Sequence, residues 1–282
     1  MKISIIHDLV RWEEKALLKA ATDRGIEVSM VDVKDMDMDL DSQLSDSYGG
    51  VSIQRCTSYY RGLHSTAFLE YKGQIVVNDL NSTTTAGNKM LTSLALVKNR
   101  VPTPRTSVST GYEAAMKQFS GKFGNRAVIK PVTGSWGRMV ALLNDKSAAT
   151  AVLEDREYMY PLYSIFYLQE YVRRPPRDIR TFVVGDRVIG GIYRYQSEGD
   201  WRTNTAIGGR AEKCEITPEL EDISIRAARS VGRGVFGIDI METDSGYVVH
   251  EVNGTTEFKN TVKVAGVDVP GEIIEYVKGV AR

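Results

Sequence analysis

Residues 237–241 (GIDIM) and 247–254 (YVVHEVNG) are the most informative part of the sequence, because together they predict two strands of one hairpin. The DSG turn between them suits a three-residue loop centred on its serine, with the glycine in the left-handed position. That register sets Asp239 directly opposite Glu251. Two carboxylates that face each other across a strand pair repel, so the hairpin favours a cation bound between them.

The polar face of this hairpin predicts a magnesium site. Asn253 lies two residues after Glu251, so it shares a face with both carboxylates. Carboxylate and amide oxygens are hard ligands that suit Mg²⁺ shared with substrate phosphates. We expect the opposite face to be largely apolar and to carry Ile238, Ile240, Val248, His250 and Val252. A solvent-facing polar side of a sheet is the alternative interpretation, which these apolar surroundings disfavour.

A second motif is AVIKPVTGSWGR at residues 127–138, in which Lys130 closes an apolar strand and a glycine loop follows at once. Glycines allow the backbone to approach an anion closely, and lysine and arginine add positive charge. The stretch does not match the GxxxxGK[ST] phosphate loop, and no helix follows it directly. The motif therefore indicates a phosphate-binding loop of another kind, or else a surface lysine beside a hairpin turn.

Two other stretches carry weaker signals. LQEYV at residues 168–172 predicts a strand that leaves through RRPPRDIR at residues 173–180, a basic segment that is by itself typical of a solvated loop. GRGVFG at residues 232–237 has the glycine spacing of a dinucleotide site, but it follows a predicted helix and enters a strand. That order is the reverse of the dinucleotide-binding context, so the sequence disfavours a nicotinamide-dependent oxidoreductase.

Composition narrows the function further. The 282 residues carry 36 basic and 36 acidic side chains, so a general nucleic-acid or membrane-surface binder is disfavoured. No apolar run reaches the roughly 18 residues of a membrane helix, and we expect no secretory leader and a reducing cytoplasm. Cys56 and Cys214 are too few for a disulfide framework or a four-ligand zinc site, and the three histidines are scattered.

The order of predicted elements gives the fold class. Strands alternate with helices over the first 80 or so residues, which predicts a parallel sheet. A second α/β stretch holds the glycine loop, and a third stretch has hairpin-connected strands typical of an antiparallel α+β unit. We therefore predict a mixed α/β and α+β chain in three parts, at residues 1–86, 87–165 and 166–282.

This order of motifs resembles the ATP-grasp ligases over essentially the whole chain. Asn204 and GGRAE at residues 208–212 are similar to the RimK-like branch, and WRTN at 201–204, EFKNT at 257–261 and VDVPG at 267–271 to the LysX ligases within it. Those ligases join 2-aminoadipate to LysW, the amino-group carrier protein of lysine biosynthesis. The resemblance implies an ATP-grasp fold that follows an N-terminal parallel α/β lobe, the pre-ATP-grasp lobe.

The resemblance also implies a nucleotide site. Lys89 and Lys130 match the lysines that hold the phosphates, residues 134–140 match the loop over them, and residues 170–172 match the hinge that bonds adenine. The full implied set is Lys89, Lys130, Gly134, Ser135, Trp136, Gly137, Arg138, Met139, Val140, Glu170, Tyr171, Val172, Asp178, Arg180, Arg194 and Asn204. Among these, catalytic roles are implied for Lys130, Arg180 and Arg194.

The remaining implied residues concern the metal and the acceptor. Asp239, Glu251 and Asn253 match the family's magnesium ligands, in agreement with the hairpin argument. Asn260 and Thr261 match a pair that marks preference for aminoadipate, where glutamate-preferring relatives carry Gly-Phe.

The resemblance implies a reaction in which ATP, with Mg²⁺, phosphorylates the terminal glutamate side chain of the carrier. The α-amine of L-2-aminoadipate then attacks the acyl phosphate and forms an amide. Expected partners are therefore an acidic carrier protein and a second copy of the chain, as a homodimer or homotetramer. We expect the carrier's terminus to enter between the first and third parts, drawn by Arg173, Arg174 or Arg177. Two alternatives stay open: a RimK-like ligase that adds glutamate, and a nucleotide-binding protein without ligase activity.

Overall fold

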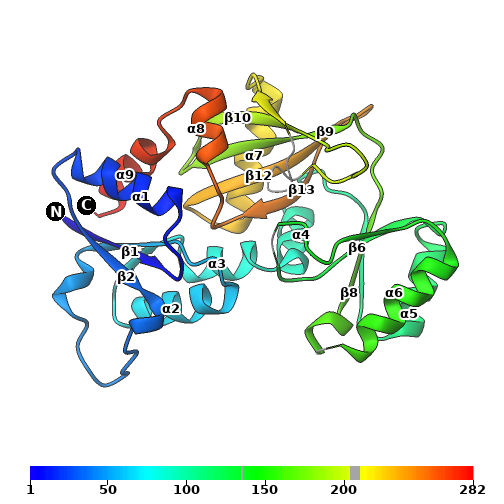
Figure 1. Ribbon diagram of the computed structural model, residues 1–282, viewed down its shortest axis with the longest axis horizontal. Coiled ribbons are helices and arrows are strands. Elements are labelled where there is room, and N and C mark those ends of the chain that lie inside the picture. The colour runs from blue at the N-terminus through cyan, green and yellow to red at the C-terminus, as the bar shows by residue number, and fades with distance from the viewer. Residues whose placement is uncertain (135, 160, 204–209, 282) are drawn as a thin grey trace.

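A computed structural model describes residues 1–134, 136–159, 161–203 and 210–281, which form three sheets with helices packed against them (Figure 1). Among the described helices, none has the length and apolar character needed to cross a membrane.

The N-terminal sheet is parallel throughout, with strand order β2-β1-β3-β4, as the alternation of strands and helices predicts. Its elements are β1 (Lys2–His7), α1 (Trp12–Thr22), β2 (Glu27–Asp32), β3 (Val51–Gln54), α2 (Tyr59–Tyr71) and β4 (Ile75–Val77). Two short 3₁₀ turns, Val33–Asp35 and Asp46–Tyr48, interrupt the Asp-rich segment between β2 and β3. The carboxyl ends of β1 and β3 lie side by side, because these strands are neighbours in the sheet.

The connection to the middle part is two helices rather than one. The sequence predicts a helix from 86 to 98, whereas the structure has α3 (Leu80–Ala86) and α4 (Lys89–Lys98). The Asn88 side chain caps the start of α4, because its Oδ1 accepts from the backbone N of Met90 at 3.0 Å and of Leu91 at 3.3 Å. This N-cap fixes Lys89 at the first position of α4.

The middle sheet has order β5-β8-β6-β7 and is antiparallel. Its elements are β5 (Thr106–Ser109), α5 (Tyr112–Gly121), β6 (Ala127–Lys130), β7 (Ala141–Leu143), α6 (Lys146–Tyr158), a 3₁₀ turn (Pro161–Ser164) and β8 (Phe166–Glu170). Because β8 pairs with β5 and β6, the boundary that we predict at residue 165 cuts this sheet and falls too early. Strand pairing divides the chain after Glu170.

The C-terminal sheet is antiparallel with order β11-β10-β9-β12-β13. Its elements are β9 (Arg177–Val184), β10 (Arg187–Tyr195), β11 (Ala211–Lys213), α7 (Pro218–Val231), β12 (Val235–Thr243), β13 (Gly246–Asn253), α8 (Lys259–Ala265) and α9 (Val269–Val280). The last helix leaves this sheet and packs beside α1 of the N-terminal part (Figure 1). Ile273 and Ile274 of α9 are buried in one core with Ile3, Ile5 and Leu17.

The decisive hairpin forms, with a correction to its register. Asp239 pairs with Glu251, as predicted, but the loop has two residues rather than three, since Thr243 pairs with Gly246. A bulge restores the predicted pair, because Ile240 pairs with Val249 and leaves His250 as the extra residue. The predicted alternation of faces is therefore wrong beyond this point: Val249 is fully buried in the apolar core in place of Val248, and His250 turns to the polar side.

Candidate active site

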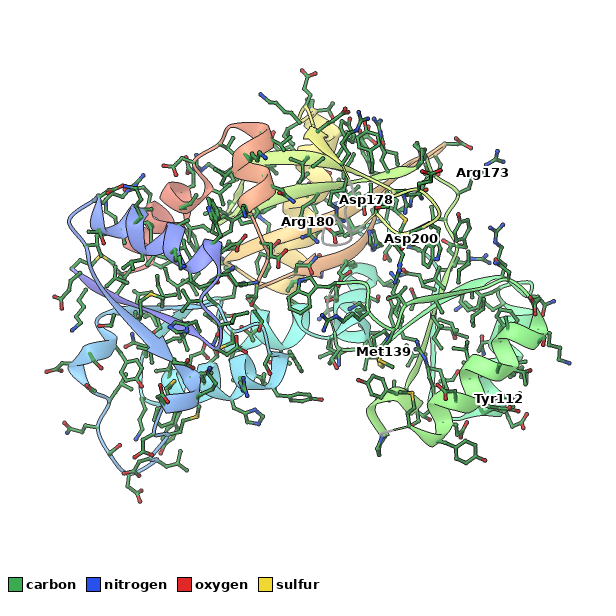
Figure 2. The ribbon with its side chains drawn as sticks, in the orientation of Figure 1. Tyr112, Met139, Arg173, Asp178, Arg180 and Asp200 are labelled. Carbon is green, nitrogen blue, oxygen red and sulfur yellow. The ribbon has the colours of Figure 1, made fainter. Side chains whose placement is uncertain are left out.

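One cavity of about 580 Å³ lies where the three parts meet. The polar face of the C-terminal sheet, the glycine loop after β6, and the segments after β1 and β3 all contribute to its wall. Figure 2 shows Asp178 and Arg180 of β9 in the middle of the molecule, between the outer sheets.

A row of charged side chains crosses this face. Strand pairing sets Glu251 beside Asp239, and Asp239 beside Arg180. Both carboxylate oxygens of Asp239 accept from Arg180, from Nε and Nη2 at 2.6 Å each, and Arg194 Nη2 lies 3.1 Å from Oδ1. Although burial alone would raise the pKa of Asp239, the two guanidinium groups hold it below its ordinary value. The two arginines thus offset the repulsion between Asp239 and Glu251, a role that the sequence alone assigns to a metal ion.

The second carboxylate of the pair faces a lysine. Lys89 Nζ lies 3.2 Å from Glu251 Oε1 and donates to the backbone oxygen of Gly134 at 2.8 Å. Burial raises the pKa of Glu251, but Lys89, Lys130 and His250 together outweigh it and lower the pKa. The cap on α4 therefore brings Lys89 between the glycine loop and the predicted metal ligands.

Lys130 is a deeply buried cation of the site. Its Nζ donates to Gln169 Oε1 at 2.7 Å, and burial lowers its pKa to about 8. Gln169 is held in turn, since its Nε2 donates to the hydroxyl of Tyr167 at 3.0 Å. The sequence analysis does not assign Gln169 to the site. Gln169 lies two residues after Tyr167, the strand partner of Lys130 on β8, and therefore on the same face of the sheet. A buried lysine whose only described hydrogen-bond partner is a neutral amide is poised to bind an anion.

Arg194 is oriented by Asp178, its strand partner on β9. The carboxylate accepts from Arg194 Nε at 2.8 Å and Nη2 at 2.7 Å, and from the Thr203 hydroxyl at 2.5 Å. Burial opposes ionisation, but the Arg194 charge holds the pKa of Asp178 well below its usual range. Asp178 lines the cavity, and both of its carboxylate oxygens accept hydrogen bonds from Arg194. Its direct effect is therefore to hold that guanidinium in place.

The predicted magnesium ligands lie together. Asp239, Glu251 and Asn253 all line the cavity, and Asn253 Nδ2 donates to Asp239 Oδ2 at 3.3 Å. Two carboxylates and an amide oxygen are a hard donor set that fits Mg²⁺. No group of three or more His, Cys, Asp or Glu side chains within the described ranges is placed to hold a metal, so such a site would depend on Asn253.

The glycine loop lines the cavity, and two hydrogen bonds join it to the C-terminal part of the chain. Trp136 Nε1 donates to Glu257 Oε1 at 3.1 Å, and Arg202 Nη1 donates to the backbone oxygen of Gly137 at 3.0 Å. The loop residues that line the cavity are Gly134, Trp136, Gly137, Arg138 and Val140. Met139 is not among them, and the predicted site residues Ser135 and Asn204 lie outside the described residues.

The predicted adenine hinge does not line this cavity. Glu170 is bonded to Arg105, whose Nε donates to Oε2 at 2.8 Å, and the Glu170 backbone N donates to the Arg105 oxygen at 2.9 Å. Arg126 stacks on the ring of Tyr171, 4.2 Å from its centroid. Val172 does not line the cavity either, and the first lining residue after this segment is Arg174.

The arginines that we expect to draw the carrier are dispersed. Arg174 lines the cavity, but Arg173 is exposed at the side of the molecule away from the N-terminal sheet (Figure 2). Arg177 is engaged, since its Nε and Nη2 donate to Glu242 at 2.7 and 3.0 Å. The structure thus does not support an entrance between the first and third parts guarded by these three residues.

The predicted acceptor pair, Asn260 and Thr261, lines the cavity together with residues of the N-terminal part. Asn260 is exposed and Thr261 is buried, and both line the wall. Sequence reasoning missed the opposing residues, which include Arg11, Trp12, Glu13, Gln54, Thr57 and Tyr59. They follow the carboxyl ends of β1 and β3, and the rule that ligands bind at that edge of a parallel sheet is the signal that would have found them.

The cavity holds one thiol, and it is inert. Cys56 is buried, and burial raises its pKa to about 12, so its thiolate is scarce at neutral pH. The arrangement is one of paired cations and oxygen donors around a space for anions. It can bring a polyphosphate and a carboxylate together and offset their repulsion.

Comparison with known proteins agrees with this geometry. Residues 86–277 match the RimK-like ATP-grasp domain, and residues 3–85 match the LysX preATP-grasp domain. The chain is 39% identical over 267 residues to the alpha-aminoadipate–LysW ligase LysX of Saccharolobus solfataricus, covering 94% of this chain and 96% of the relative. It is 32% identical over 280 residues to the glutamate–LysW ligase ArgX of Sulfolobus acidocaldarius, covering 99% and 98%.

Among solved structures, a RimK domain ATP-grasp protein from Sphaerobacter thermophilus superimposes with a TM-score of 0.81. The match covers 98% of this chain and 99% of that one at 24% identity, so it shows the shared fold.

Proposed function

Since the chain belongs to the RimK-like ATP-grasp family, whose members are ADP-forming carboxylate–amine ligases, we propose that it joins L-2-aminoadipate to a LysW-like carrier protein in lysine biosynthesis. The carboxylate is the side chain of the carrier's terminal glutamate, and the amine is the α-amine of the amino acid.

One observation carries this proposal: Asn260 and Thr261 line the same cavity as Lys89, Lys130 and the Asp239–Glu251 pair. An acceptor pocket and a phosphate site that share one space allow the amine to meet an activated carboxylate without release of the intermediate. The relatives named as aminoadipate–LysW ligases support the choice of amino acid, at 37–39% identity.

The charges of the site fit a reaction between anions. We infer that Lys89, Lys130, Arg180 and Arg194 bind the triphosphate and the carrier's carboxylate. Arg180 and Arg194 then stabilise the negative charge that develops during phosphoryl transfer. Asp239, Glu251 and Asn253 would hold Mg²⁺, which when bound supplies further positive charge to the phosphate oxygens. Anion binding favours the charged form of Lys130, so this lysine is protonated when nucleotide is bound.

The bond changes need no protein nucleophile. A carboxylate oxygen of the carrier takes the γ-phosphoryl group of ATP, which releases ADP. The neutral amine attacks the acyl carbon, phosphate leaves with the electrons of its bond to that carbon, and the amine gives up a proton. The high pKa of the Cys56 thiol and the scattered histidines agree with this direct transfer.

A glutamate ligase is the second candidate. The match to ArgX covers 99% of this chain, so glutamate is a credible acceptor and the arginine pathway a credible setting. One methylene separates the two amino acids, and a pocket that only fills a methylene discriminates by about 1–3 kcal/mol.

The test is a direct assay with a purified carrier of the LysW type, ATP and Mg²⁺. We expect release of ADP and a carrier heavier by one aminoadipyl residue, measured by intact-protein mass spectrometry. A carrier that lacks its terminal glutamate is the matched control and should stay unmodified. Preferential addition of glutamate would replace the first candidate by the second, and no addition of either would contradict both.

A further inference from the structure

The segment between the predicted metal ligands and the acceptor pair is held by the N-terminal part of the chain. Residues 254–259 join Asn253 to Asn260, and Arg55 Nη2 donates to the backbone oxygen of Thr256 at 3.1 Å. The ring of Phe258 is fully buried and meets the ring of Trp12 edge-on, with centroids 5.9 Å apart. The position of the predicted acceptor pair, Asn260 and Thr261, therefore depends on residues about 200 or more positions earlier in the chain.

Helix α8, which carries the acceptor pair, lacks a cap of its own. Its N-cap residue is Phe258, whose side chain cannot accept a hydrogen bond. The first backbone N–H groups of a helix need partners from outside the helix. Glu13 of α1 provides them, since its Oε1 accepts from the backbone N of Phe258 at 3.2 Å and of Lys259 at 3.1 Å.

The Glu13 carboxylate is dedicated to this contact. It is buried, and among the described residues no basic side chain lies within salt-bridge distance of it. Its neighbour Glu14 takes the nearby cations instead, accepting from Arg11 Nη2 at 2.8 Å and from Arg55 Nε at 3.1 Å. A negative charge at a helix N-terminus also interacts favourably with the helix dipole.

We propose that Glu13 is a positioning residue for the acceptor amino acid. It acts by fixing the first turn of α8, and so the direction in which Asn260 and Thr261 face the cavity. The inference rests on the proposed function only in naming an amino acid as the ligand of this end of the cavity. It assigns to the N-terminal part a share in acceptor recognition that does not involve the nucleotide.

This role predicts a particular kinetic pattern. Loss of the cap leaves two N–H groups unpaired and lets the start of α8 move, so the amino acid binds less well. Among the described residues, Lys89, Lys130 and the Asp239–Glu251 pair form no hydrogen bond or ion pair with Glu13, so ATP binding should not change.

The experiment compares Glu13→Ala with Glu13→Gln and with Glu27→Ala. In Glu13→Ala, we expect the KM for the amino acid to rise about tenfold, with the KM for ATP within about twofold. Glu13→Gln keeps an oxygen that can accept both N–H groups, and it should restore a KM close to that of the unchanged chain. Glu27 is an exposed carboxylate on β2 of the N-terminal sheet, and its loss should change neither KM.

Hydrogen exchange of the α8 amides gives a readout that needs no substrate. Exchange across residues 258–263 should be faster in Glu13→Ala than in the unchanged chain, and near normal in Glu13→Gln. Unchanged exchange, or an unchanged amino-acid KM, would overturn the positioning role. If the unchanged chain uses neither aminoadipate nor glutamate, the proposed function fails, while the exchange result still decides whether Glu13 caps α8. If Glu13→Ala does not fold, Glu13→Asp replaces it, because a carboxylate one methylene shorter cannot reach both N–H groups. A raised amino-acid KM in Glu13→Asp with a near-normal KM in Glu13→Gln would support the role, and a normal KM in Glu13→Asp or a tenfold rise in Glu13→Gln would overturn it.

Discussion

The two ends of the cavity are constructed in different ways. What we propose as the phosphate end consists of Lys89, Lys130, Arg180, Arg194, Asp239 and Glu251, and what we propose as the acceptor end consists of Arg11, Trp12, Glu13, Lys259, Asn260 and Thr261. At the phosphate end, side chains on adjacent strands form ion pairs with one another, as Asp239 does with Arg180. At the acceptor end, side chains of one part bind the backbone of another, as Glu13 does.

The difference shows which interactions position the side chains at each end. At the phosphate end, strand register fixes Asp239 beside Glu251 and Arg180, and the Asn88 cap at the start of α4 fixes Lys89, so this geometry follows from strand pairing and one helix cap. The acceptor end depends on how α1 docks against the segment before α8, through contacts between residues 245 positions apart. The chemistry can therefore stay constant at one end while the choice of amino acid changes at the other.

The largest effect is expected from Asp239→Asn, at the centre of the phosphate end. Turnover should fall on the order of a thousandfold, because the change removes one charge of the predicted metal site and the partner of two guanidinium groups. The sequence alone predicts that this change leaves the fold intact, because removing the repulsion between two carboxylates does not harm the sheet. The structure predicts the opposite, a loss of about 3 kcal/mol, since Arg180 and Arg194 are left without their shared anion.

Steady-state rates with varied Mg²⁺ and denaturant unfolding measure the two effects. Asp186→Asn is a matched control, because Asp186 is an exposed carboxylate paired with Arg229. Full activity in Asp239→Asn with an unchanged need for Mg²⁺ would show that this residue is not a metal ligand.

Lys130 should give the phosphate end a pH dependence. With a pKa of about 8 in the free protein, the lysine is charged below that pH and neutral above it. ATP affinity should therefore be constant at lower pH and fall as the pH rises through about 8, since the neutral amine cannot attract phosphate. Lys130→Gln should bind ATP about thirtyfold more weakly and lose this step. Calorimetric titration of ATP from about pH 6.5 to 9.5 would detect it.

A step that persists unchanged in Lys130→Gln would assign the titration to another group. Lys122 is an exposed lysine on the middle part, and Lys122→Gln is the control for a general loss of charge.

The Asn260-Thr261 pair tests the acceptor end directly. Replacing it with Gly-Phe should shift the ratio of kcat/KM towards glutamate by about tenfold, because groups placed for the longer side chain are removed. ATP affinity should stay the same, since the predicted metal ligands end at Asn253. The measurement is kcat/KM for both amino acids with one carrier, before and after the change. An unchanged ratio would place specificity elsewhere on the wall.

The contrast between the ends also explains what the sequence could predict. The parallel N-terminal sheet and the Asp239–Glu251 pair follow from local pattern and strand pairing, and both are confirmed. The predicted loop length was one residue too long, and the bulge at His250 compensated for it. A bulge adds one residue to one strand and leaves no mark in the alternation of a short motif.

Tertiary docking accounts for the residues that the sequence reading missed. Glu13 lies in an ordinary amphipathic helix, where an acidic residue in the first turn is common. Only the approach of α8 turns it into a cap for another helix. In the same way, β8 looks like the start of the C-terminal part until its pairing with β5 and β6 is known.

The smallest effect is expected from Trp136→Phe, which tests a direct link between the two ends. The indole Nε1 of Trp136 on the glycine loop donates to Glu257 Oε1 at 3.1 Å, and Arg11 Nη1 lies 3.6 Å from the same oxygen. Phenylalanine keeps most of the ring's packing, including its contact with Arg138, but it cannot donate. A single hydrogen bond at a partly exposed site is worth about 1 kcal/mol, so closure of the loop should weaken by a few fold at most.

That loss should affect both substrates, in contrast to the changes at either end alone. We expect kcat to fall about threefold, with similar small rises in the KM for ATP and for the amino acid. Hydrogen exchange across residues 134–140 should slow in the unchanged chain when ATP and Mg²⁺ are added, and should slow less in Trp136→Phe. Glu257→Gln keeps an oxygen that can accept from the indole, so it should retain the slowing and serves as the matched control. If Trp136→Phe alters the KM for ATP alone, the loop belongs to the phosphate end, and the two ends respond independently.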